Sequence, residues 1–239
     1  MTDIAAQVSA SLDALTQEFD VISNNLANAS TTGYKRRCNA FTKALEEQGV
    51  VQNLDGTSEA VLDFSQGNLV QTDRTLDFAL HGKGFFVIET PDGPLYTRHG
   101  VFQTNQNGQI VDLSGRVVAG VAGPISLPTE IDLGSLHVAA DGRISAGGAA
   151  VGQFRVVEFS DSENRLIPTG STCFRTPADL EPTDAENPVV KQGYQEASNV
   201  KLVDELVSMI MVSRLYESSM RLVAVNRETA NSMLGVAMG

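Results

Sequence analysis

Residues 4–26 read IAAQVSASLDALTQEFDVISNNL. Apolar side chains recur in this stretch at intervals of three or four residues, which is the spacing of one face of an α-helix. The positions of this stripe are Ile4, Val8, Leu12, Leu15, Phe19, Ile22 and Leu26. Residues 28–33, NASTTG, follow it with poor helix formers and a glycine. The pattern predicts an amphipathic helix over about residues 3–29.

A second stripe lies at the other end of the chain and alternates intervals of four and three, as in helices that seat against another helix. Its positions are Leu202, Leu206, Met209, Ser213, Tyr216, Met220, Val223, Arg227, Ala230 and Leu234, broadened by Val203, Val207 and Ile210. Ser198 or Asn199 is the expected N-cap, and Asp204 and Glu205 place acid near the positive end of the helix dipole. We expect a helix over about residues 200–235 that pairs with the first in a coiled-coil-like layer.

The middle of the chain has the pattern of antiparallel β-structure. Turn dipeptides interrupt it at Asp55-Gly56, Gln66-Gly67, Asp92-Gly93, Asn107-Gly108, Ser114-Gly115 and Asp141-Gly142. The runs between them, such as residues 84–88, 109–111, 116–119 and 153–159, are rich in Val, Ile and Phe. The fold class is therefore α+β, with a mainly antiparallel β central domain and long amphipathic helices at both ends.

These patterns predict four parts. Residues 1–48 and 191–239 form a discontinuous helical assembly domain, and residues 49–64 are an outward connection. Residues 65–175 are a β-rich outer domain, and the acidic, proline-bearing residues 176–190 are a solvated return connection.

The charge of the chain is concentrated in its middle. The net charge is −12, and residues 49–190 hold eight Lys and Arg against eighteen Asp and Glu. This excess of acid disfavours nucleic acid as a partner. The basic run Lys35-Arg36-Arg37 is expected to be a solvated cluster after the first helix. No stretch approaches the roughly 20 apolar residues of a membrane span, and the N-terminus has no conventional secretory signal, so membrane insertion is not expected.

Signatures of catalysis and of metal sites are absent from the sequence. The one G-x-G, Gly82-Lys83-Gly84, lacks a third glycine and opens a strand-like run. His81, His99 and His137 lack ligand spacing and are interpreted as turn or surface residues. Cys38 and Cys173 are interpreted as free thiols rather than a disulfide. We therefore expect no enzyme activity, no catalytic or metal site, no cofactor and no small-molecule substrate.

Several motifs carry a resemblance to a known family. They are ISNNLANASTTGYKR at 22–36, DFSQG at 63–67, LDFA at 76–79, GKGFF at 82–86, YTRHGVF at 96–102 and QGYQEASNV at 192–200. Together they span nearly the whole chain, which resembles the bacterial flagellar rod and hook axial proteins. Within that family the chain is most similar to the proximal-rod members, with a distal-rod or hook paralogue as the alternative.

The resemblance implies a structural subunit of the flagellar basal-body rod. In this family the terminal helices pack as the inner layer of a helical tube that crosses the periplasm and transmits torque. Subunits leave the cell through the flagellar type III export apparatus without a cleaved signal peptide, and the partners are other copies and other axial proteins. The expected assembly interface combines the first stripe with Asn24, Asn25, Asn28, Tyr194, Asn199 and Val200, and with part of the second stripe. The part of the second stripe consists of Leu202, Val203, Leu206, Met209, Ile210, Tyr216, Met220 and Val223.

A hypothesis from another class is a soluble β-domain hydrolase or adhesin whose terminal helices only cover its own core. In either case the apolar side chains of the two stripes should be buried, since burial of a Leu or Ile side chain contributes roughly 1.5 to 3 kcal/mol of stability.

Overall fold

The computed structural model describes residues 2–39, 60–128, 133–160 and 162–238. Side chains are described from residue 9 to residue 225 within these ranges. The expected Asp55-Gly56 turn, and most of the expected connection over residues 49–64, lie outside the described residues.

The chain divides into two compact units, and the backbone passes from one unit to the other four times. One unit comprises Met1–Ala27, Arg37–Val61 and Lys201–Gly239 and is called the helical unit below. The other comprises Asn28–Arg36 and Leu62–Val200 and is called the β module. Residues 28–36 and 191–200, which the sequence grouped with the terminal helices, belong to the β module.

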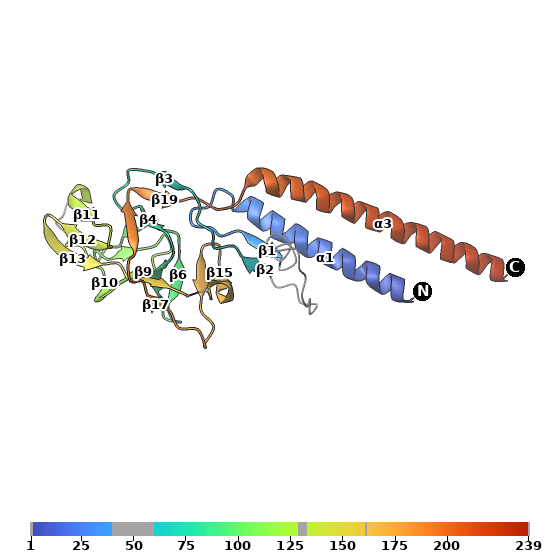
Figure 1. The fold of residues 1–239 in the computed structure, drawn as a ribbon, viewed down its shortest axis with the longest axis horizontal. Helices are drawn as coiled ribbons and strands as arrows, with labels where there is room; N and C mark the ends of the chain where they lie inside the picture. Colours follow the sequence, from blue (N-terminus) through green and yellow to red (C-terminus); the bar gives the residue numbers. More distant parts are fainter. Residues whose placement is uncertain (1, 40–59, 129–132, 161, 239) are drawn as a thin grey trace. The chain divides into compact units, whose positions relative to one another are not determined.

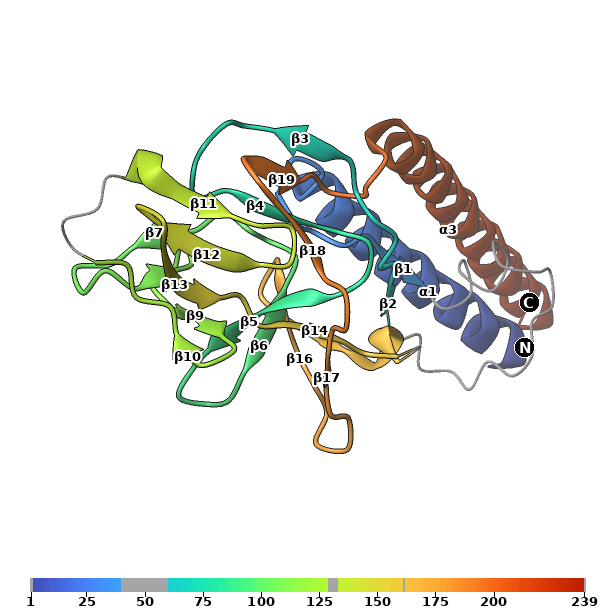
Figure 2. The ribbon, with the colours of Figure 1, turned by 60° about the vertical axis from the view of Figure 1, so that its left-hand side comes forward.

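The helical unit contains α1 (Thr2–Ala27), β1 (Arg37–Asn39), most of β2 (Ala60–Leu62) and α3 (Leu202–Met238). Strands β1 and β2 pair as a two-stranded sheet. Figures 1 and 2 show α1 and α3 side by side, and the two helices are in contact. The two long helices predicted from the stripes are therefore confirmed, while their coiled-coil-like packing stays a prediction.

The start of α3 differs from the expectation. The helix begins at Leu202, and the amide of Glu205 donates to the carbonyl of Lys201 as its first helical bond. Ser198 and Asn199 lie upstream of this turn, so their assignment as N-cap is wrong. Asp204 and Glu205 do lie in the first turn, where the helix dipole favours acid.

The strands of the β module are short. They are β3 (Leu69–Gln71), β4 (Phe78–His81), β5 (Phe85–Glu89), β6 (Leu95–Thr97), β7 (Gln103–Thr104), β8 (Ile110–Val111), β9 (Val117–Gly120), β10 (Gly123–Pro124), β11 (Leu136–Val138), β12 (Arg143–Ala146), β13 (Ala149–Gln153), β14 (Val156–Glu158), β15 (Ile167–Thr169), β16 (Cys173–Arg175), β17 (Thr183–Asp184), β18 (Val189–Gln192) and β19 (Tyr194–Glu196). Two short 3₁₀ helices lie at Leu133–Ser135 and Glu163–Arg165.

The largest sheet has the order β15-β16-β6-β5-β9-β8-β7, with β10 on β9 and with β14 between β5 and β17. Strands β11, β12 and β13 form a separate three-stranded sheet. Two further pairs, β18 with β4 and β19 with β3, join the end of the module's chain to its beginning. The registered pairs of these sheets are antiparallel, which confirms the predicted β class.

Strand β5 separates two hydrophobic clusters. Its side chains alternate between faces, so Phe86 and Ile88 belong to one cluster while Phe85 and Val87 belong to the other. The first cluster includes T-shaped contacts of Phe154 with Phe86, with ring centroids 5.5 Å apart. A strand that is buried on both faces reads as a continuous apolar run, which explains why GFFVI lacks alternation in the sequence.

Most of the predicted turns are observed. Gly93, Gly108, Gly115 and Gly142 all have positive φ, the conformation that these dipeptides were expected to supply. The return connection is more structured than expected, because it contains β17 and the start of β18.

Candidate assembly interface

Helix α3 exposes apolar side chains around most of its circumference. The exposed ones are Leu202, Val203, Leu206, Val207, Ile210, Met211, Leu215, Tyr216, Met220, Leu222 and Val225, and their exposed fractions range from 42% to 69%. Successive helical positions are about 100° apart, so these residues cannot share one face. A helix that is apolar on several sides is stable in water only when neighbours cover it.

The buried side chains of α3 form a row that runs beside the predicted stripe and shares two positions with it. Glu205 and Val212 are buried, and Met209, Ser219 and Val223 are half-buried, at intervals of four, three, seven and four. Met209 and Val223 were on the predicted stripe. Leu206 and Met220 were also placed on it, yet they are exposed by 42% and 45%. The sequence did not indicate the buried side, because two of its positions, Glu205 and Ser219, are polar.

Helix α1 buries its predicted stripe only in part over the residues whose side chains are described. Leu12, Leu15 and Leu26 are half-buried and Ile22 is 2% exposed, whereas Phe19 is 42% exposed. Ile4 and Val8 lie in α1, but their side chains are outside the described set.

Two asparagines of α1 bond within the chain. The Asn24 side chain donates to the carbonyl of Asp20 at 2.8 Å. Asn25 is buried, and its amide both donates to the carbonyl of Arg37 and accepts from the amide of Arg37, each at 2.8 Å. Asn25 therefore fixes the start of β1 against the last turn of α1.

Three chain segments of the β module meet where the chain passes to and from the helices. We call residues 31–36, 63–67 and 195–199 the clamp. The amide of Gly33 donates to the carbonyl of Glu196 at 2.7 Å, and the amide of Asp63 donates to the carbonyl of Arg36 at 2.9 Å. The outgoing segment after α1 and the returning segment before α3 are thus tied to each other.

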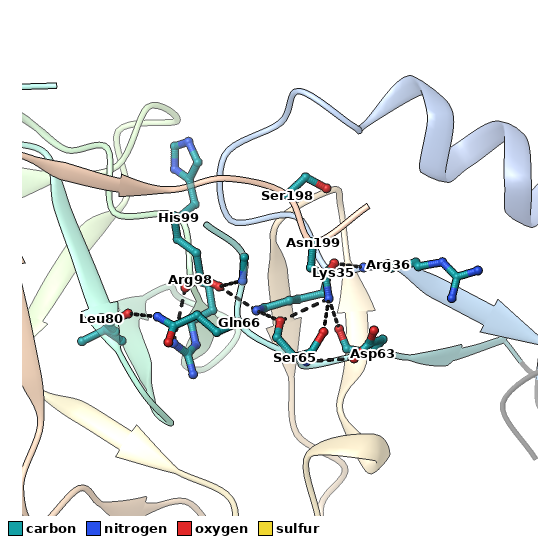
Figure 3. A network of polar contacts seen from close by, with 12 residues as sticks. Lys35, Arg36, Asp63, Ser65, Gln66, Leu80, Arg98, His99, Ser198 and Asn199 are labelled. Carbon is teal, nitrogen blue, oxygen red and sulfur yellow. Dashed lines mark hydrogen bonds and ion pairs between the residues drawn. The ribbon is translucent and has the colours of Figure 1, made fainter. Parts of the chain in front are cut away.

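Lys35 lies at the centre of the clamp (Figure 3). Its ammonium donates to Oε1 of Glu196 and to the carbonyl of Ser65, both at 2.7 Å. The side chains of Lys35 and Glu196 are 1% and 0% exposed. The expectation that Lys35 belongs to a solvated basic cluster is wrong, because its side chain is buried in an ion pair with Glu196. This partner lies far along the chain.

Glu196 accepts from two further donors. The amide of Gly67 donates to Oε1 at 3.1 Å, and Nη1 of Arg98 lies 3.4 Å from Oε2. The Arg98 guanidinium also stacks over the ring of Phe85, 5.2 Å from its centroid. Burial lowers the pKa of Lys35, and the neighbouring Glu196 carboxylate opposes this shift. Burial likewise lowers the pKa of Arg98, again against Glu196.

Asn199 completes the clamp. Its side chain accepts from the amide of Arg36 at 2.7 Å and donates to the carbonyl of Asp63 at 2.8 Å. It also donates to Ser65, as Figure 3 shows. One amide group therefore bonds both of the other two clamp segments.

The remaining expected interface residues have local roles in the β module. Tyr194 lies in β19, and its hydroxyl bonds the Gln71 side chain at 3.3 Å. Asn28 accepts from the hydroxyl of Thr31, and the amide of Val200 donates to the hydroxyl of Ser198.

Cys38 and Cys173 form no disulfide and are both buried, in agreement with the sequence. Cys173 lines a polar cavity of about 270 Å³ together with His99, Asp112 and Arg116. The Arg116 guanidinium bonds Asp112 at 2.6 Å and donates to Sγ of Cys173 at 3.2 Å. His99 is half-buried, and burial lowers its pKa against the opposing charge of Asp112.

Within the described ranges, neither helix combines the length and apolar character that crossing a bilayer requires. The described His, Cys, Asp and Glu side chains form no group of three that could hold a metal ion.

Three family models match the chain. Residues 6–35 match "Flagella basal body rod protein", residues 79–146 match "Flagellar hook protein FlgE/F/G D1 domain", and residues 191–237 match "Flagellar basal body rod FlgEFG protein C-terminal". The outer two matches contain most of α1, most of α3 and the clamp residues 31–35 and 195–199.

Curated relatives cover most of the chain. The flagellar basal-body rod protein FlgF of Caulobacter vibrioides is 32% identical over 226 residues, covering 91% of both chains. FlgG of Agrobacterium fabrum is 34% identical over 251 residues, covering 92% of this chain and 94% of its own. FlgG of Buchnera aphidicola from Acyrthosiphon pisum is 34% identical over 236 residues, covering 86% and 88%.

Proposed function

Because the chain belongs to the flagellar basal-body rod protein family and is a structural subunit of the rod, we propose that it polymerises through α1 and α3. The single observation that carries this proposal is the set of exposed apolar side chains on α3. They lie on several sides of the helix, so one neighbouring helix cannot cover them all. Copies of the same helices in a tubular assembly supply neighbours on several sides.

Such an assembly is open-ended rather than a closed ring. A rod grows by heterologous contacts that do not close into a ring, so each subunit needs at least two different adhesive surfaces. The α3 face of Val203, Val207 and Ile210 and the face of Leu202, Leu206 and Tyr216 provide two such surfaces. We place the self-contacts and the contacts with other axial proteins on these faces and on the α1 stripe.

The clamp supports a role in torque transmission. It ties the segment that leaves α1 to the segment that enters α3, through the Lys35–Glu196 pair and Asn199. A load on either helix therefore reaches the folded β module through two anchored segments rather than one. We propose that torque passes between the helical unit and the β module by this route.

We further propose that the subunit belongs to the proximal rod. The alignment with FlgF of Caulobacter vibrioides covers 91% of this chain in 226 residues, whereas the alignment with FlgG of Agrobacterium fabrum needs 251 for 92%. The FlgG alignment thus contains more inserted residues, which favours FlgF. The FlgG position remains the alternative, since relatives with both names match at similar identity.

Export by the flagellar type III apparatus and a rod that spans the periplasm complete the proposal, and both are supported by family membership. The rod family is structural, and the comparisons give no support to a hydrolase or an adhesin.

The test is a double substitution, Leu206→Asp with Ile210→Asp, in a strain whose own gene copy carries the changes. Both side chains are exposed, so the purified monomer should keep its thermal stability while swimming in soft agar and rod assembly are lost. The matched control is Leu113→Asp, an apolar residue of the β module that is 60% exposed. Normal swimming of the double variant would refute assembly through α3.

A further inference from the structure

Residues 189–199 form the end of the β module's chain before α3, and we call them the strap. Strand β18 pairs with β4 and β19 pairs with β3. Between and beside these strands, the amide of Val190 donates to the carbonyl of Ala140, and the amide of Ala197 donates to the carbonyl of Asn68, each at 2.8 Å. The strap therefore contacts parts of the module that lie far apart in the sequence, around residues 68–81 and around residue 140.

The polar side chains of the strap satisfy buried groups elsewhere. The Gln192 amide donates to the carbonyls of Thr75 and Leu136, each at 3.0 Å, and accepts from the amide of Val138 at 3.0 Å. Gln195 donates to Oδ2 of Asp77 at 2.6 Å, and Asp77 is fully buried. These bonds join β11 to the segment before β4, although neither belongs to the strap.

Without the strap, two buried cations lose their carboxylate. Lys35 and Arg98 are 1% and 3% exposed, and both bond Glu196. A buried charge without its partner is strongly unfavourable, so the segments that carry these cations cannot take their native positions alone. The separation along the chain is 161 residues for Lys35 and 98 for Arg98.

We propose that the strap docks last and that residues 31–36 and 63–80 reach their native structure only when it does. Contacts between distant segments form late because the chain entropy of closing the loop must first be overcome. Here the late contact is also the one that neutralises the buried cations. Residues 31–36 and 63–80 therefore stay open until residue 199 is present and free to dock.

Late docking of the strap would affect export, a point that rests on the proposed function. A subunit that leaves the cell as an unfolded chain must not fold while part of it is still in the channel. A module that closes only with residues 189–199 delays folding until most of the chain has emerged. The folding claim itself concerns the isolated protein and stands or falls independently of rod assembly.

The direct test is pulse-labelling hydrogen exchange during refolding of the unchanged full-length chain. The proposal predicts that amides of residues 31–36 and 63–80 gain protection at the same rate as those of residues 189–199. If residues 31–36 or 63–80 become protected more than about tenfold faster than the strap, the proposal is overturned.

A second measurement uses Glu196→Gln, which keeps the shape of the side chain and removes its charge. The unfolding equilibrium constant should rise roughly a hundredfold or more, with protection lost together across residues 31–36, 63–80 and 189–199. The control is Asp184→Asn, whose exposed pair with Arg155 should change that constant by less than about fivefold. Loss of protection confined to residues 31–36 would contradict the proposal. If the variant does not fold in water, the refolding order of the unchanged chain decides.

Discussion

The ammonium of Lys35 lies 2.7 Å from the Oε1 atom of Glu196, 161 residues later in the chain, and both side chains are buried. Lys35 follows α1 closely, and Glu196 precedes α3 closely. The pair therefore ties the segment that follows α1 to the segment that precedes α3.

The two partners of this ion pair should differ in their contribution to stability. Lys35→Met leaves Glu196 with Arg98 and the amide of Gly67, whereas Glu196→Gln leaves two cations without a carboxylate. We expect Glu196→Gln to lower the free energy of unfolding by about 3–5 kcal/mol and Lys35→Met to lower it by clearly less. Urea denaturation of the purified monomer measures both. Equal losses would show that Arg98 does not share the carboxylate.

Gly67 should tolerate no side chain. A Cβ atom at this position would overlap the carbonyl oxygen of Ala197 in the strap, although the backbone conformation of Gly67 is ordinary. We expect Gly67→Ala to cost about 3 kcal/mol or more, because the obstacle is backbone that is held by the clamp. The control is Gly152→Ala, where a Cβ would lie 3.6 Å from Ile125 and the cost should stay within about 1 kcal/mol. Similar melting temperatures for the two variants would contradict the clamp geometry.

His99 should make the β module sensitive to mild acid. Burial lowers its pKa below the ordinary value of 6.5, so between these two values the unfolded chain binds more protons than the folded chain. The stability that depends on neutral His99 is complete above about pH 6.5 and is lost as the pH falls through the folded-state pKa. His99→Gln should therefore flatten the decline of the free energy of unfolding between about pH 7 and pH 5. An unchanged slope would mean that His99 binds protons equally in the folded and the unfolded chain.

Local patterns in the sequence predicted the secondary structure well. Turn dipeptides such as Asn107-Gly108 and the three-four spacing in α1 depend on neighbours within a few residues, and these elements were found where expected. Gln66-Gly67 is the exception. Gly67 lacks positive φ and is needed instead because the strap passes so close to it.

The clamp could not be predicted from the sequence. Lys35 stands in a basic run after a helix, which favours a solvated position, and nothing near it reveals a carboxylate 161 residues away. Asn199 was assigned as a cap for the same reason, since its partners Arg36 and Asp63 are distant in sequence. The sequence did not show which side of α3 faces α1, because apolar residues occur on several of its sides and only burial distinguishes them.

Photo-cross-linking from Val203 in isolated basal bodies tests the central claim most directly, since this α3 side chain is 69% exposed in the monomer. A benzophenone amino acid at position 203 should yield adducts with a second copy or another axial protein. The matched position is Val121, which is 66% exposed on the β module. Assembly through α3 predicts abundant adducts from position 203 in basal bodies and none in the purified monomer. A position 203 that forms no adducts in rods containing the labelled subunit would contradict the account.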